Sequence, residues 1–160
     1  LIPCDPYVRE GCARSPGATL VDLPTLLAES DVVSLHASLT DETRLLIGEK
    51  ALRAMKPGAI LINTARGEIA DEEAVARALT EGWIAGAALD AFTREPLPAA
   101  SPLRAVDPER LILTPHNVSH SEAGRRANLA LALSQILAVG RGEPPTHCVH
   151  PGGIPPWRTR

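Results

Sequence analysis

The chain has 160 residues, of which 44% are hydrophobic, enough for one domain with its own apolar core. Aromatic residues make up only 2%, so aliphatic side chains must build that core. The net charge of −3 and the scattered basic residues argue against nucleic acid or a membrane surface as partner. Three cysteines without a CxxC pair argue against a disulfide framework and favour a cytoplasmic location. No apolar run approaches the length of a membrane span.

Short apolar runs alternate with helical patterns along the chain. After a first strand that ends at Asp5, we expect strands at Thr19–Val21, Val32–His36, Ala59–Asn63, Ile84–Asp90 and Leu111–Thr114. These runs do not alternate with polar residues, which is typical of strands buried on both faces of a parallel sheet. The later strands recur at intervals of about one strand-plus-helix unit.

Capping signals predict the helices between these strands. Pro24 suits the first turn of one helix, and Glu49–Met55 forms a second that ends before Pro57-Gly58. Asp71 is an N-cap for Glu72–Glu81, and Gly82 ends that helix.

A longer helix follows the last strand. Ser119 and Glu122 have the spacing of a capping box, and the helix runs to about Val139. Its apolar stripe consists of Leu129, Leu133, Ile136 and Leu137. The Gly-, Pro- and Arg-rich residues 141–160 read as a tail or linker, which leaves 1–140 as the folded domain.

This alternation predicts an α/β fold with a Rossmann-like, doubly wound parallel sheet. Ligands bind such sheets beyond the carboxyl ends of the strands, so the residues there are the candidates for function. They are Asp5, the run Thr64-Ala65-Arg66-Gly67, Asp90, Glu95 in the following loop, and His116.

These residues have complementary chemistry. The planar guanidinium of Arg66 suits a carboxylate gripped at two points. His116 can transfer a proton near neutral pH, and Glu95 could bond its other ring nitrogen and fix the tautomer. Asp5 could accept hydrogen bonds from ribose hydroxyls and would repel a 2′-phosphate, although it could equally cap a turn with Pro6. Asp90 could likewise be a plain turn residue.

Three runs in this order, "ILINTARGEIADEEAVARAL", "GWIAGAALDAFTREPLP" and "LILTPHNVSHSEA", resemble the nicotinamide-binding domain of the D-isomer-specific 2-hydroxyacid dehydrogenases, which include phosphoglycerate dehydrogenase. The run "DVVSLHASLTDETRLLIG" resembles the preceding strand and turn of that domain, and "CDPY" resembles its ribose-binding aspartate. The likeness spans roughly residues 1–150.

The resemblance implies an enzyme that transfers a hydride between NAD(H) and a small D-2-hydroxy acid or 2-keto acid. Arg66 would bind the substrate carboxylate, His116 would be the general acid/base, and Glu95 its partner. Asp5 would bind the adenosine ribose. Ala37 and Thr64 would contact the cofactor through their backbones, Asp90 would reach the nicotinamide carboxamide, and His116 would lie beside the same ring. The family also implies a homodimer.

The sequence departs from the family pattern in two turns. Ser38 stands where the family usually has proline, and Asn117-Val118-Ser119-His120 follows His116 where glycines or an aromatic residue are frequent. The second departure leaves the substrate subfamily open.

A Gly-rich phosphate loop is not found in the sequence. The dinucleotide fold needs GxGxxG about 20 residues before the ribose-binding acid, yet Asp5 is near the start, and Gly140-Arg141-Gly142 does not qualify. We therefore expect an incomplete sheet, with the first strand, the Gly-rich loop and the substrate domain upstream of Leu1. We expect the 160 residues alone to be unstable or associating and to bind NAD weakly.

Two other interpretations stay open. The same residues suit an NAD(H)-sensing, co-repressor-like binding protein, and a truncated inactive product is a further possibility. A zinc site from His116, His120 and the His147-Cys148-His150 run is disfavoured, because Ser119 would cap a helix between the first two and no other ligand has suitable spacing. We expect no metal.

Overall fold

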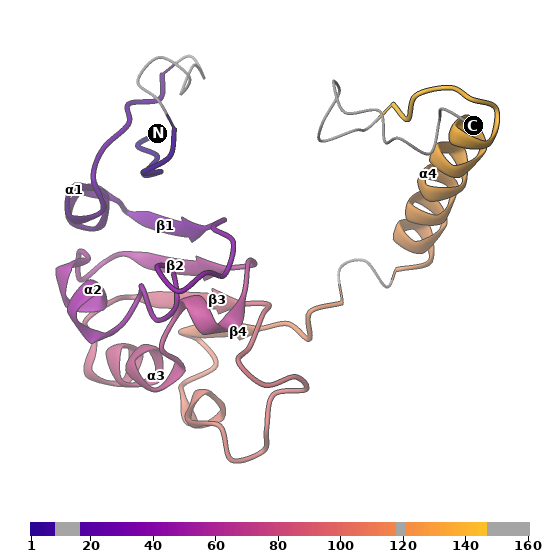
Figure 1. The fold of residues 1–160 in the computed structure, drawn as a ribbon. Helices are drawn as coiled ribbons and strands as arrows, with labels where there is room; N and C mark the ends of the chain where they lie inside the picture. The colour runs from indigo at the N-terminus through magenta and orange to yellow at the C-terminus, as the bar shows by residue number, and fades with distance from the viewer. Residues whose placement is uncertain (9–16, 118–120, 147–160) are drawn as a thin grey trace. The chain divides into compact units, whose positions relative to one another are not determined.

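Four short strands form one parallel sheet in the computed structural model, which describes residues 1–8, 17–117 and 121–146. The strands are β1 (Val32–Leu35), β2 (Ile60–Asn63), β3 (Gly86–Leu89) and β4 (Leu111–Leu113). They lie side by side in chain order, and every neighbouring pair is parallel (Figure 1). The predicted Rossmann-like α/β sheet is therefore confirmed.

Helices precede, connect and follow these strands. They are α1 (Leu23–Glu29), α2 (Glu49–Ala54), the 3₁₀ turn η1 (Gly67–Ile69), α3 (Glu72–Glu81), the 3₁₀ turn η2 (Pro102–Ala105) and α4 (Glu122–Gly140). Helix α2 contacts both α1 and α3, and α3 contacts η2. Because right-handed crossovers join strands that are neighbours in chain order, the connecting helices lie on one face of the sheet.

Burial of the strand side chains follows this one-sided cover. One row across the sheet, buried in every strand, consists of Val33, Leu61, Ala87 and Leu111. The opposite face carries Val32, Ile60 and Ile112, which are 52%, 41% and 64% exposed. The prediction of strands buried on both faces is therefore wrong for the described residues, because helices cover only the first face.

The two earliest predicted strands do not form. Residues 1–5 and Thr19–Val21 belong to no strand. The N–H groups of Thr19 and Val21 donate to the carbonyls of Leu1 and Pro3 at 3.1 and 3.0 Å. These two bonds make too short a ladder, and Pro3 has no N–H with which to extend it.

The other predicted elements form within about two residues of their expected bounds. Helix α3 matches the prediction at both ends, since the Asp71 carboxylate accepts from Glu73 and Ala74 and Gly82 adopts a φ of +76°. At α1, Asp22 is the N-cap and Pro24 lies in the first turn. The N-cap of α4 is Ser121 rather than the predicted Ser119, which lies outside the described residues.

The chain divides into two compact units, Leu1–His116 and Asn117–Arg160. Helix α4 belongs to the second unit, and its side chains Leu129, Leu133, Ile136 and Leu137 are 48% to 65% exposed. The predicted division into 1–140 and 141–160 thus stays a prediction. Within the described ranges, no helix is both long and apolar enough to cross a membrane.

Replacing Asp71 by Ala should lower the free energy of unfolding by about 1 kcal/mol, because two N–H groups at the start of α3 lose their acceptor. Chemical denaturation measures the change. Glu73→Ala removes a neighbouring carboxylate without removing the cap and should cost only a few tenths of a kcal/mol, roughly. Equal losses for the two variants would contradict the capping role.

Candidate active site

The turn after β2 carries Arg66, and the side chain of Asn63 organises it. Asn63 Nδ2 donates to the Arg66 carbonyl at 2.9 Å, and Asn63 Oδ1 accepts from the Ala65 N–H at 3.0 Å. Arg66 is exposed, and its Nη1 donates to the Ala65 carbonyl at 2.7 Å. The guanidinium therefore lies against its own turn and keeps further N–H donors for a ligand.

Gly67 lets this turn approach the loop after β3. A Cβ atom at Gly67 would lie 2.0 Å from the carbonyl carbon of Phe92 and 2.3 Å from the nitrogen of Thr93. The Thr93 N–H also donates to the carboxylate of Glu72, the first residue of α3, at 2.6 Å. Backbone contact thus links the Arg66 turn to the loop that carries Glu95.

The loop after β4 is anchored to Asp90, which follows β3 and is 8% exposed. Asp90 Oδ1 accepts from the Thr114 hydroxyl at 2.5 Å and from the His116 N–H at 3.2 Å. His116 has a φ of +50°, a left-handed conformation that costs a residue with a Cβ on the order of 1–2 kcal/mol. The two bonds to Asp90 help hold His116 in this conformation.

Glu95 and His116 are in direct contact. His116 Nδ1 lies 2.8 Å from Glu95 Oε1, and both side chains are about 40% exposed, at 39% and 41%. The Phe92 N–H donates to the same carboxylate oxygen at 3.0 Å. This bond first, and the His116 ring second, lower the pKa of the Glu95 carboxyl below its ordinary value.

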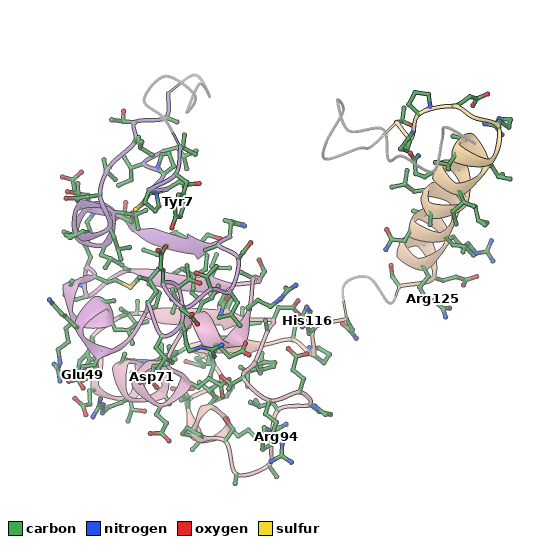
Figure 2. All side chains as sticks on the ribbon, viewed as in Figure 1. Tyr7, Glu49, Asp71, Arg94, His116 and Arg125 are labelled. Carbon is green, nitrogen blue, oxygen red and sulfur yellow. The ribbon has the colours of Figure 1, made fainter. Side chains whose placement is uncertain are left out.

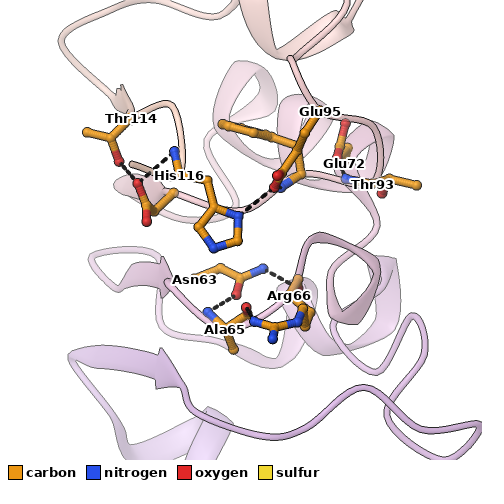
Figure 3. Close-up of polar contacts among 10 residues, drawn as sticks. Asn63, Ala65, Arg66, Glu72, Thr93, Glu95, Thr114 and His116 are labelled. Carbon is orange, nitrogen blue, oxygen red and sulfur yellow. Dashed lines mark hydrogen bonds and ion pairs between the residues drawn. The ribbon is translucent and has the colours of Figure 1, made fainter. Parts of the chain in front are cut away.

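An ionised Glu95 can only accept, so Nδ1 of His116 must carry the proton that joins them. Nε2 is then the ring atom left for a substrate. In Figure 3 the imidazole points from the loop after β4 toward the turn that carries Arg66. Figure 2 shows His116 at the edge of the unit that carries the sheet.

A depression of about 460 Å³ lies at the carboxyl ends of β1 and β2. Residues 36–39 form one wall and residues 64–66 the other. The predicted cofactor contacts Ala37 and Thr64 therefore line the same depression as Arg66. His36 lines it too, and its Nε2 lies 2.9 Å from the Ser34 hydroxyl.

Asp5 lies exposed near the start of the chain. Its Oδ1 accepts from the Tyr7 N–H at 2.9 Å. This bond closes the turn at Pro6 and fits the alternative interpretation of Asp5 as a turn cap. The Tyr7 hydroxyl in turn donates to Glu42 in the segment after β1.

The structure brings together most of the predicted site residues. Glu95 touches His116, Asp90 binds the backbone of His116, and Arg66 follows the neighbouring strand β2. Sequence reasoning missed Asn63 and Glu72, and it included Gly67 in the candidate run without giving it a role, although all three shape the loops between the site residues. An asparagine that ends the apolar run Ile60–Asn63 is the one signal that could have pointed to this role.

Among the described residues, no group of three or more His, Cys, Asp or Glu side chains could hold a metal ion. The zinc candidates His120, His147, Cys148 and His150 lie outside those residues.

Residues 1–118 match the family model of the D-isomer specific 2-hydroxyacid dehydrogenase NAD binding domain. The chain belongs to this dehydrogenase family. It is 44% identical over 146 residues to a glyoxylate reductase of Korarchaeum cryptofilum, covering 91% of this chain and 43% of the reductase. It is 40% identical over 156 residues to a D-3-phosphoglycerate dehydrogenase of Methanocaldococcus jannaschii, covering 97% of this chain and 29% of that protein.

The family's solved structures share the fold. A D-lactate dehydrogenase from Lactobacillus jensenii, crystallised with NAD⁺, superimposes with a TM-score of 0.77 at 31% identity. The alignment covers 92% of this chain and 47% of the D-lactate dehydrogenase. The chain thus spans less than half the length of these three dehydrogenase-family relatives.

Gly67→Ala should lower the free energy of unfolding by about 1–3 kcal/mol, because a methyl group at this position has to displace the backbone of Phe92 and Thr93. Urea denaturation of the full-length protein measures it. Gly58→Ala is the matched control, since a Cβ there meets nothing within 4 Å. A Gly67 variant as stable as the Gly58 variant would refute the close packing of the two loops.

Proposed function

We propose that the full-length protein is an NAD-dependent oxidoreductase that transfers a hydride between the cofactor and a small D-2-hydroxy acid or 2-keto acid. The observation that carries the proposal is the 2.8 Å contact between Glu95 and His116 at the sheet edge that also carries Arg66. A guanidinium, a carboxylate and an imidazole on adjoining loops suit a small anion that gains or loses a proton on oxygen.

Arg66 binds the substrate carboxylate in this mechanism. Its guanidinium presents several N–H donors in one plane, which match the two oxygens of a carboxylate. It already donates to the Ala65 carbonyl, so substrate binding uses its remaining donors. This interaction orients the carbonyl carbon and selects acids over neutral ketones.

His116 moves the proton at the substrate oxygen. With Nδ1–H bonded to Glu95, Nε2 donates to the carbonyl oxygen in reduction and accepts from the hydroxyl in oxidation. Glu95 stays a carboxylate throughout, because the Phe92 N–H and the His116 ring lower its pKa. It thereby keeps the ring in one tautomer and orientation and stabilises the positive charge when the ring is protonated.

The residues present fit part of a dinucleotide. The depression between residues 36–39 and 64–66 offers backbone at Ala37 and Thr64, and Asp90 lies beside the catalytic loop. NAD supplies the hydride acceptor in this chemistry, or the donor when reduced. Asp90 uses Oδ1 for both contacts to the His116 loop, which suits Oδ2 to a carboxamide of the cofactor. His116 is also proposed to lie beside the nicotinamide ring.

We further propose a homodimer in the cytoplasm. The family resemblance supports the dimer, and the three cysteines without a CxxC pair support a reducing compartment. Size-exclusion chromatography with light scattering of the full-length protein tests the oligomeric state.

The decisive experiment is His116→Gln in the full-length protein, assayed by NADH oxidation with a panel of small 2-keto acids. Glyoxylate comes first, because relatives are named glyoxylate reductases. We expect kcat to fall by about 10²–10⁴-fold, since general acid/base catalysis contributes that much. Arg66→Lys should lower kcat/KM chiefly through KM, while Arg53→Lys on α2, outside the site, should not.

Wild-type protein that binds NADH but reduces none of these acids would favour the alternative function, an NAD(H)-sensing, co-repressor-like binding protein. Unchanged kcat in His116→Gln would refute the role of the imidazole.

Asp5 is proposed to bind the adenosine ribose and to exclude a 2′-phosphate. Asp5→Asn keeps an oxygen for the Tyr7 N–H but removes the negative charge. The ratio of kcat/KM for NADH to that for NADPH should fall by about tenfold, because the repulsion is lost. Asp31→Asn, an exposed carboxylate paired with Lys56 before β1, is the control. An unchanged ratio in Asp5→Asn would contradict the assignment.

A further inference from the structure

Asn63 occupies a position that an apolar side chain would ordinarily fill. It lies in the buried row of the sheet between Leu35 of β1 and Leu89 of β3, and it is only 1% exposed. Burying an amide in an apolar layer costs several kcal/mol, roughly, unless its polar atoms are hydrogen-bonded. A leucine here would extend the apolar row, so the amide must serve another purpose.

Both polar atoms of Asn63 are bonded to the turn that carries Arg66. Oδ1 accepts from the Ala65 N–H and Nδ2 donates to the Arg66 carbonyl. These groups belong to the peptide between residues 64 and 65 and the peptide between residues 66 and 67, so the amide holds the two-residue segment 65–66 at both of its ends. The Arg66 carbonyl also accepts from the Ile69 N–H at 3.3 Å, which ties the turn to η1.

The same residue joins the turn to the His116 side of the site. The Asn63 carbonyl accepts from the Asp90 N–H at 2.9 Å, and Asp90 in turn binds the backbone of His116. Asn63 and Asp90 are two of the three buried polar side chains among the described residues. Each is bonded to a loop that presents one of the proposed catalytic side chains. Figure 3 shows the bonds of Asn63 to Ala65 and Arg66.

We propose that Asn63 is the positioning residue for Arg66: its buried amide fixes the turn so that the guanidinium meets the substrate carboxylate. The proposal rests on the proposed function, because it assigns Asn63 a role only through Arg66. Displacing a binding group by about 1 Å can cost 10²-fold in rate, so a small shift of this turn is enough for a measurable effect.

The test uses Asn63→Asp in the full-length protein. Aspartate keeps the shape and the acceptor for the Ala65 N–H, loses the donor to the Arg66 carbonyl and places a negative charge against it. We expect kcat/KM for a 2-keto acid to fall by about 10- to 100-fold, mostly through KM. Because Asn63 acts on the turn rather than on the proton path, the pH profile of kcat should keep its shape. Asn63→Ser, smaller and neutral, should lose less and serves if the aspartate variant does not fold.

Ser30→Ala is the matched control. Ser30 is the third buried polar residue and precedes β1, at the opposite end of the strands from Arg66. It should leave kcat/KM within about twofold of wild type, as expected for a change remote from the site.

A double-mutant cycle separates positioning from general stability. If Asn63 acts through Arg66, then Asn63→Asp combined with Arg66→Lys is no worse than Arg66→Lys alone. Losses that multiply, or a wild-type kcat/KM in both Asn63 variants, would overturn the proposal. Full activity in Arg66→Lys would instead refute the role of Arg66, and wild-type protein that reduces none of the 2-keto acids would refute the proposed function, so the failures can be told apart.

Discussion

The parallel register of β2, β3 and β4 is the constraint on which the site depends. Asn63, Leu89 and Leu113 stand opposite one another in adjacent strands, so the chain leaves all three strands at the same level of the sheet. Parallel strands can only be joined by crossovers, which return each loop to this one edge. Residues that follow different strands, and that are far apart in the sequence, therefore become neighbours at this edge.

Register alone would leave the loops free, and the second requirement is contact between them. Gly67 admits the backbone of Phe92 and Thr93, and Glu72 binds the Thr93 N–H from the first turn of α3. The Glu95 loop is thus held by the element that follows Arg66. Geometry at the guanidinium and at the imidazole is coupled through backbone packing, which is stiffer than contact between long exposed side chains.

Local signals account for what the sequence could predict. The prediction of helix α3 was correct at both ends, because the cap Asp71 and the terminal Gly82 act on backbone groups only a few residues away. The prediction of a strand at Thr19–Val21 was wrong, because a strand needs a paired partner segment and only two backbone hydrogen bonds join these residues to theirs. Burial on both faces was wrong because the strand sequence does not reveal which face the helices cover. Arg66, Glu95 and His116 were found from their place after strands, but the amide of Asn63 looked like one more strand residue.

His116, the proposed acid/base group, is held in its conformation by loop residues rather than by the strand before it. Glu95 accepts from the Phe92 N–H within its own loop, so its carboxylate is oriented by a bond that does not involve His116. The left-handed backbone at His116 turns the ring toward that carboxylate, and Asp90 holds the turn from the other side. Two carboxylates thus hold His116: Asp90 binds its main chain, and Glu95 binds its ring. A histidine bonded through both its main chain and its ring is held in one rotamer and one tautomer, which is the preorganisation that the proposed proton transfer at Nε2 requires.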